Sequence, residues 1–180
     1  MQEVASAQRW RAPVAPAQRR PVQLHEIVLV GAHGGAGVST LAALLQPAWD
    51  MGAMRGSPDP RFPPVRTAGR PLVLVTRNTV AAAARATAAV AAFTGAGGQI
   101  AALIVVADSP LPEPAEASYR LRLLIARVGA IVRMPFIPAL RLVDEPAPVN
   151  LPRTARRALG EVRHQVYVHA TRAQPVRRPS

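Results

Sequence analysis

Four apolar runs divide the sequence and predict its buried strands. They are IVLV at residues 27–30, PLVLVT at 71–76, QIAALIVVA at 99–107 and AIVRMP at 130–135. Continuous runs of aliphatic and β-branched residues are typical of strands in a parallel sheet, because helices cover both faces of such a sheet. The pattern therefore predicts a mainly parallel sheet.

Apolar residues at helical spacing fill the intervals between these runs. They predict helices over residues 38–45, 80–94, 116–128 and 151–168, with Asn78 or Thr79 capping the second helix and Asn150 the last. Residues 51–70 contain GSPDPRFPP and no apolar run, so a loop is predicted there, and Trp49 before it is expected to pack near the sheet. The alternation of strands and helices predicts an α/β three-layer sandwich over residues 24–168.

The two ends of the chain have a different composition. Residues 1–23 and 169–180 are rich in arginine and proline and predict a disordered basic arm and a disordered basic tail. The formal net charge is +12, of which residues 1–23 carry +3 and residues 150–180 carry +6. Such ends can attract nucleic acid or an acidic membrane surface, although a solvated tail with no specific partner explains the charge equally well.

Composition excludes several classes of function. The sequence has no cysteine, which excludes thiol catalysis, disulfides and cysteine-ligated metals. No apolar stretch approaches the roughly 20 residues of a membrane-spanning helix, and residues 1–23 lack the apolar core of a secretory signal, so a cytoplasmic protein without a transmembrane segment is expected. All 22 basic residues are arginines, a usage typical of a GC-rich genome such as an actinobacterial one.

A glycine-rich loop follows the first predicted strand. Gly31, Gly34, Gly35 and Gly37 allow a sharp turn, and the helix expected from Val38 would place backbone N–H groups at its amino end. Unpaired N–H groups and aligned peptide dipoles there suit a phosphate. Against the phosphate-loop pattern G-x-x-x-x-G-K-[ST], Ala32 replaces the first glycine and Val38 replaces the lysine, whereas the second glycine and the hydroxyl residue Ser39 are kept.

This loop resembles that of a known family of ATPases. The residues that carry the resemblance are His33, Gly34, Gly35, Ala36, Gly37, Val38, Ser39 and Thr40. The string is similar to the deviant Walker A loop, K-G-G-x-G-K-[ST]-T, of the MinD/ParA-like (SIMIBI class) P-loop ATPases, and is closest to degenerate CpaE/TadZ-like members. The segment FIPAL, after the fourth predicted strand, resembles the proline-containing segment that follows a late strand in the same family.

The resemblance implies a reduced P-loop NTPase fold, a cofactor and a set of site residues. The eight residues from His33 to Thr40 would contact ATP, and Ser39 would hold Mg²⁺. The two lysines of the family motif, one reaching across a dimer and one contacting the phosphates, are His33 and Val38 here. The Walker B and switch strands have no counterpart in residues 51–70, where Asp59 follows no strand. The loss of the lysines and the loss of the Walker B and switch strands argue against hydrolysis. They imply at most weak binding of ATP with Mg²⁺.

Few residues elsewhere in the chain are candidates for binding or catalysis. Arg77, at the end of the second predicted strand, is the best replacement cation, with a solvent-facing arginine as the alternative. Asp108, at the end of the third, lies where the resembled family contacts the nucleotide base. The four histidines lack metal-ligand spacing, and His164 and His169 are expected on the surface of the last helix. Asp144 and Glu145 are adjacent and cannot flank a substrate.

The departures from the motif, together with the resemblance, predict a pseudoenzyme: a degenerate MinD/ParA-like protein that acts as a non-hydrolysing adaptor or positioning factor. The resemblance implies that it serves a secretion, pilus or conjugation machine. Its partner would be a protein of that larger assembly, and a homodimer is compatible with the family. The first alternative is a weak ATP-binding ATPase in which an arginine replaces the Walker A lysine. The second is a basic nucleic-acid-binding module.

Overall fold

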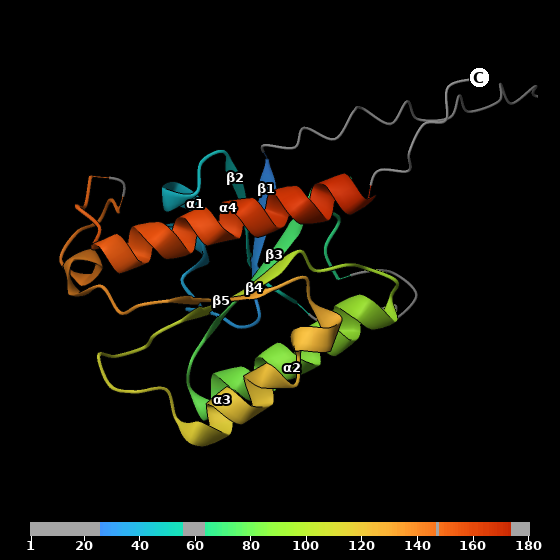
Figure 1. Ribbon diagram of the computed structural model, residues 1–180, viewed down its shortest axis with the longest axis horizontal. Coiled ribbons are helices and arrows are strands. Elements are labelled where there is room, and N and C mark those ends of the chain that lie inside the picture. Colours follow the sequence, from blue (N-terminus) through green and yellow to red (C-terminus); the bar gives the residue numbers. More distant parts are fainter. Residues whose placement is uncertain (1–25, 56–63, 147, 174–180) are drawn as a thin grey trace, which may run out of the picture.

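The computed structural model describes residues 26–55, 64–146 and 148–173. Strands and helices follow one another in the order seen in Figure 1, with no helix between the second and third strands in the described residues. The strands are β1 (Ile27–Gly31), β2 (Ala48–Ala53), β3 (Leu72–Arg77), β4 (Ala102–Val106) and β5 (Ile131–Met134). The helices are α1 (Val38–Leu44), α2 (Val80–Gly95), α3 (Ala115–Arg122) and α4 (Arg153–Ala173), with short 3₁₀ helices η1 (Ile125–Arg127) and η2 (Pro138–Arg141).

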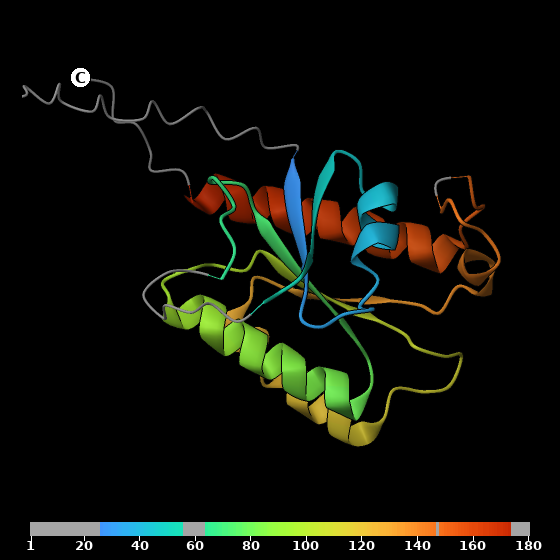
Figure 2. The same ribbon diagram turned by 180° about the vertical axis from the view of Figure 1, so that it is seen from behind.

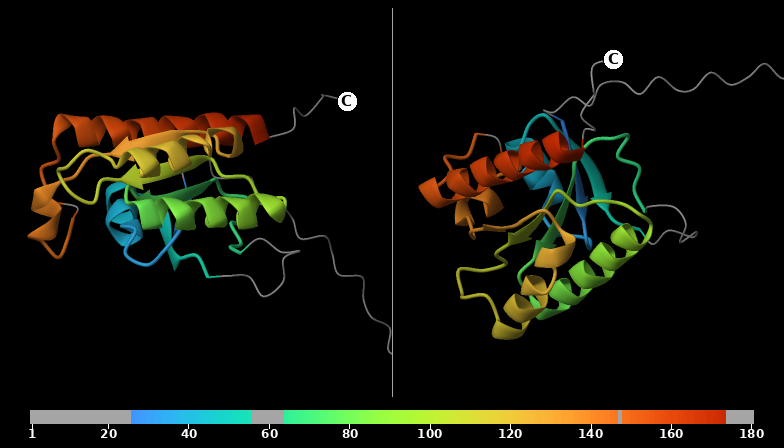
Figure 3. Two further views of the ribbon diagram at one scale, coloured as in Figure 1. Left: turned by 90° about the horizontal axis from the view of Figure 1, so that it is seen from below. Right: turned by 45° about the vertical axis from the view of Figure 1, so that its right-hand side comes forward.

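All five strands are parallel, in the order β2-β1-β3-β4-β5. This is one of the common orders of a doubly wound sheet, in which the chain runs from β1 first to one side and then to the other. Helices α1 and α4 cover one face of the sheet and α2 and α3 the other, above and below the sheet in Figure 2 and in the right-hand view of Figure 3. The predicted α/β three-layer sandwich with a parallel sheet is confirmed.

Alternating residues of the central strands supply both halves of the core. Along β1, Ile27 and Leu29 pack against α1 and α4, whereas Val28 and Val30 pack against α2 and α3. All four side chains are nearly inaccessible to solvent. Burial on both faces explains why this strand is continuously apolar, and why β1, β3 and β4 could be recognised from their composition.

The fifth strand, β2, was not predicted, and its residues 51–53 contradict the start of the loop expected over residues 51–70. It pairs with β1 at the edge of the sheet, and its residues from Trp49 onward are exposed. Trp49 is 52% exposed, and the Arg70 guanidinium lies 5.0 Å from the centre of its ring. An edge strand with one partner and little burial has no need of an apolar run, so its sequence did not reveal it.

Two predicted helices differ from those in the structure. The helix expected over residues 116–128 ends at Arg122, and the chain then tightens into η1, where Arg127 N–H donates to the Leu124 carbonyl three residues back. The last helix begins at Arg153, after Pro152, so the predicted cap at Asn150 is wrong. It continues to Ala173, five residues beyond the expected boundary of the domain at 168.

The remaining boundaries cannot be assessed in the same way. The predicted arm at residues 1–23 and most of the tail at 169–180 lie outside the described residues. None of the helices in the described residues combines the length and the apolar composition of a membrane-spanning segment.

Candidate functional site

The loops that follow the strands meet at the carboxyl edge of the sheet, because all strands point the same way. Ligands of doubly wound sheets bind at this edge, in the crevice where the strand order reverses. Here the order reverses between β1 and β3. The glycine-rich loop after β1 and the turn after β3 therefore define the candidate site.

Close packing fixes the path of the glycine-rich loop. A Cβ atom at Gly31 would lie 2.8 Å from the His33 carbonyl oxygen, so this position needs glycine for steric reasons alone. Gly35 and Gly37 have φ values of +74° and +97°, a region that favours glycine. The turn is thus built as the sequence predicts, and Gly37 is the residue that precedes α1.

The structure brings the eight predicted site residues into one turn but gives them different exposures. Ala36 and Val38 are buried, and Val38, only 7% exposed, packs in the core between the sheet and α4. His33, Gly37 and Thr40 are half-buried, whereas Gly34, Gly35 and Ser39 are exposed. Within the described residues, no hydrogen bond involves the backbone N–H groups of residues 34–40. The predicted contact with ATP stays a prediction.

His33 is held across the loop by both ring nitrogens. Its Nδ1 lies 2.9 Å from the Gly34 carbonyl oxygen, and its Nε2 lies 3.4 Å from the backbone nitrogen of Arg77. Since a carbonyl can only accept and a backbone N–H can only donate, the neutral tautomer with the proton on Nδ1 satisfies both contacts. His33 therefore ties the loop to the end of β3.

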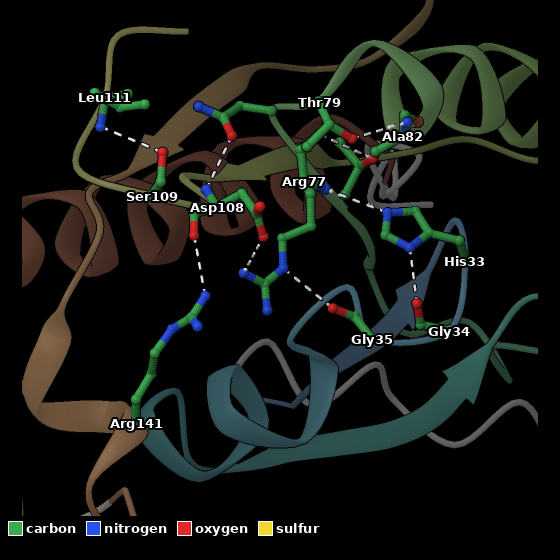
Figure 4. A network of polar contacts seen from close by, with 12 residues as sticks. His33, Gly34, Gly35, Arg77, Thr79, Ala82, Asp108, Ser109, Leu111 and Arg141 are labelled. Carbon is green, nitrogen blue, oxygen red and sulfur yellow. Dashed lines mark hydrogen bonds and ion pairs between the residues drawn. The ribbon is translucent and has the colours of Figure 1, made fainter.

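Arg77 makes the second connection between the loop and β3, as Figure 4 shows. Its Nε donates to the Gly35 carbonyl oxygen at 3.1 Å, and its Nη1 lies 3.0 Å from Oδ1 of Asp108. The side chain is only 27% exposed. The predicted replacement cation is thus beside the loop with its contacts at the surface, and its role toward a phosphate stays a prediction. Its guanidinium contacts a loop carbonyl and a carboxylate.

Asp108 is fixed from three directions. Its backbone N–H donates to Oδ1 of the buried Asn78 at 2.9 Å, and its carbonyl oxygen accepts from Nη2 of Arg141 at 3.0 Å. Thr79 caps α2 by accepting from the Ala82 N–H, so one of the two predicted caps is confirmed. Asn78 instead joins β3 to the end of β4, a role that its place before the helix did not reveal.

A cavity of about 120 Å³ lies beside this network. Gly37, Thr40, Leu41 and Leu44 line it from the loop and α1, and Arg77 lines it from β3. The rest of its wall comes from the ends of β4 and β5 and from η2: Val106, Ala107, Met134, Pro135, Phe136, Ile137, Leu140 and Arg141. Pockets that enclose drug-sized ligands measure about 300–1,000 Å³, so this cavity is too small to enclose a nucleoside triphosphate.

Little in the described residues suits a metal ion. No group of three or more histidine, aspartate or glutamate side chains there could hold one. Ser39, the predicted Mg²⁺ ligand, is exposed, and the Asp50 carboxylate on β2 accepts from the Gly52 N–H at 2.7 Å. Asp59 lies outside the described residues. Among the residues that the structure describes, the predicted Mg²⁺ site therefore has the Ser39 hydroxyl group as its one proposed ligand.

Two ionisable groups away from the loop have shifted pKa values. Hydrogen bonds from Arg70 and Trp49 lower the pKa of the Glu26 carboxyl group. Burial lowers the pKa of His169, and the charge of Arg172 lowers it further. His169 was expected on the surface of α4, but it is half-buried and lines a second cavity, at the other edge of the sheet.

Sequence reasoning missed Arg141 and the apolar wall of the cavity. Arg141 follows the segment FIPAL, whose likeness to a family motif was the available signal. No protein-family model matches the sequence, and no curated protein or solved structure is significantly similar to it.

Proposed function

We propose that the chain is a degenerate MinD/ParA-like P-loop protein that acts as a non-hydrolysing adaptor or positioning factor. The observation that carries the proposal is the position of Arg77. Its guanidinium contacts the Gly35 carbonyl and the Asp108 carboxylate, so the cation that contacts the loop is used inside the protein. A charge already paired in this way is poorly placed to hold a triphosphate.

Two further observations support the absence of hydrolysis. Val38 is part of the core, so the position of the phosphate-binding lysine provides packing instead of charge. The described residues offer no cluster of carboxylates for Mg²⁺. By family analogy the assembly would be a secretion, pilus or conjugation machine, and this step rests on the resemblance alone.

The weak ATP-binding alternative has one observation in its favour, which is again Arg77. An arginine 3.1 Å from a loop carbonyl is close enough to turn toward a bound phosphate if the pair with Asp108 opens. The two hypotheses make opposite predictions for Arg77→Met. If Arg77 occupies the loop, its removal leaves nucleotide affinity unchanged or raises it. If Arg77 replaces the lysine, its removal abolishes binding.

The test is calorimetric titration of the full chain and of the Arg77→Met variant with Mg-ATP and Mg-ADP, together with a phosphate-release assay. We expect no turnover and no micromolar binding by the unmodified chain. Gly37→Arg, which blocks the loop, is the control for any heat that is observed. Turnover that disappears in Ser39→Ala would overturn the adaptor proposal.

A further inference from the structure

The cavity beside the glycine loop combines an apolar interior with two cationic side chains. Leu41 and Leu44 of α1 face Met134, Ile137 and Leu140 of β5 and the segment after it. Arg77 and Arg141 belong to the same wall. This composition differs from that of a phosphate site, which is polar throughout. It suits a group with an apolar part and a negative charge close together.

The size of the cavity limits the apolar part to one side chain. A cavity of about 150 Å³ lined by leucine, isoleucine and phenylalanine admits a single benzene molecule. The cavity here measures about 120 Å³ and has walls of the same kind. One aliphatic or small aromatic side chain fits it, whereas a fused-ring nucleoside with its ribose does not.

Arg141 marks where the negative charge would lie. Its guanidinium lies 5.2 Å from the centre of the Phe136 ring and donates Nη2 to the Asp108 carbonyl oxygen. None of the ion pairs among the described residues includes Arg141. A guanidinium has five N–H donors, and stacking on a ring leaves most of them available for a carboxylate. Arg141 is therefore held in place without a partner of opposite charge in the described part of the chain.

Exposed apolar side chains around the same edge indicate a protein as the partner. Leu142, directly after Arg141, is 84% exposed, and Val143 is 41% exposed. Leu111, in the loop after β4, is 72% exposed. Because β4 and β5 are parallel neighbours, their following loops lie at one edge of the sheet. A free small acid would fill the cavity but leave these side chains in water, whereas a protein surface would cover them.

We propose that the carboxyl edge of the sheet is a docking surface for the carboxyl-terminal residue of a partner protein. The apolar side chain of that residue enters the cavity, and its terminal carboxylate pairs with Arg141, with Arg77 nearby. A terminal residue is the simplest group that carries an apolar side chain and a carboxylate so close together. The inference rests on the proposed adaptor role, for which it supplies the chemistry of the partner.

The test uses a fluorescein-labelled Gly/Ser peptide that ends in leucine with a free carboxylate. The same peptide with a terminal amide removes the charge, and one that ends in glycine removes the side chain. Polarisation is measured on the full chain with protein up to millimolar concentration. We expect saturable binding of the leucine acid and a loss of at least about tenfold in affinity for either altered peptide, as expected when a charge-assisted contact is removed.

Two substitutions locate the binding. Arg141→Gln removes the free charge, and Leu140→Trp fills the cavity. Each substitution is expected to lower the affinity for the peptide that ends in leucine acid to the affinity of the unmodified chain for the amide peptide. Arg122→Gln, which removes one exposed arginine from the end of α3 on the opposite face, is the matched control and leaves binding unchanged. Circular dichroism confirms that each variant is folded.

The proposal fails if the acid and the amide bind equally, if no binding occurs at millimolar protein, or if Arg141→Gln and Arg122→Gln behave alike. These outcomes are separate from those of the nucleotide experiments. ATP turnover would overturn the adaptor role even with peptide binding intact, and absence of peptide binding would leave the result on hydrolysis unchanged.

Discussion

Replacing Arg77 by methionine tests whether this side chain holds the glycine loop against the rest of the sheet. Methionine keeps an unbranched apolar stem of similar length and removes the guanidinium, so packing changes little and the polar contacts are lost. The lost contacts are those with the Gly35 carbonyl at 3.1 Å and the Asp108 carboxylate at 3.0 Å. The contact of His33 with the backbone N–H of residue 77 remains.

The expected cost follows from the exposure of these groups. The hydrogen bond with the Gly35 carbonyl is exposed, and a typical hydrogen bond contributes about 0.5–1.5 kcal/mol net. Arg77 is 27% and Asp108 50% exposed, so their ion pair belongs with solvent-screened pairs that contribute about 0.2–1 kcal/mol. We expect a total loss of about 2 kcal/mol in the free energy of unfolding. For a chain of this size that loss lowers Tm by about 4–8 °C.

Urea unfolding followed by circular dichroism measures the loss in the free energy of unfolding. Amide hydrogen exchange shows which part of the structure opens more easily. Exchange should accelerate in Arg77→Met at the bonded amides that flank the loop, Ala32, which donates to the Val75 carbonyl, and Leu41, which donates to the Gly37 carbonyl. It should not do so in the control Arg133→Met, which breaks the pair with Glu113 at 3.0 Å, on β5 and away from the loop. A loss below about 0.5 kcal/mol, or unchanged exchange at Ala32 and Leu41, would refute the claim that Arg77 fixes the loop. A double-mutant cycle with Asp108→Ala isolates the ion pair.

Three further predictions concern the scaffold. Gly129→Ala places a Cβ atom 2.4 Å from the Ala101 carbonyl oxygen and should cost about 1–3 kcal/mol in urea unfolding, whereas Gly160→Ala on the open face of α4 should not destabilise the fold. Thr79→Ala removes the cap of α2 and should lower the free energy of unfolding by about 1 kcal/mol, whereas Thr79→Ser keeps the capping hydroxyl and should cost much less. Because burial lowers the pKa of His169 in the folded state, the unfolded chain binds more protons as pH falls below about 6.5, and stability falls with it. His169→Gln should flatten this part of the pH–stability profile, and an unchanged slope would contradict the shift.

The sequence predicted the central strands well, because burial on both faces leaves a continuous apolar run. Strands β1, β3 and β4 inside the sheet fall on the runs that predicted them, and so does the edge strand β5, in which Val132 and Met134 are buried. The edge strand β2 was missed, since Trp49 and Met51 are exposed and the strand depends on its hydrogen bonds to β1. The predicted helix ends were wrong in two places. The last helix begins after Pro152 and not at Leu151, and the third helix gives way to the 3₁₀ helix η1.

The candidate site was only partly predictable for a related reason. The glycine loop is formed by neighbouring residues in the sequence, so its turn could be predicted from the spacing of its glycines alone. The contacts of Asp108 with Arg77, Asn78 and Arg141 join the ends of three parallel strands, and the register of those strands sets the distances. A single sequence records which residues end the strands but not which of them will touch.

The glycine pattern is weaker evidence for a bound phosphate than its sequence suggests. Gly31, Gly35 and Gly37 each have a steric or conformational reason to be glycine that holds with nothing bound in the loop. A lysine at position 38 would have to leave the core or bury its charge there, whereas Val38 fits the core as it is. The loop can thus require its glycines for packing without a cation beside it. The feature that separates a phosphate site from a structural turn is a cation free to face the loop, which makes Arg77→Met more informative about nucleotide binding than substitution of any glycine.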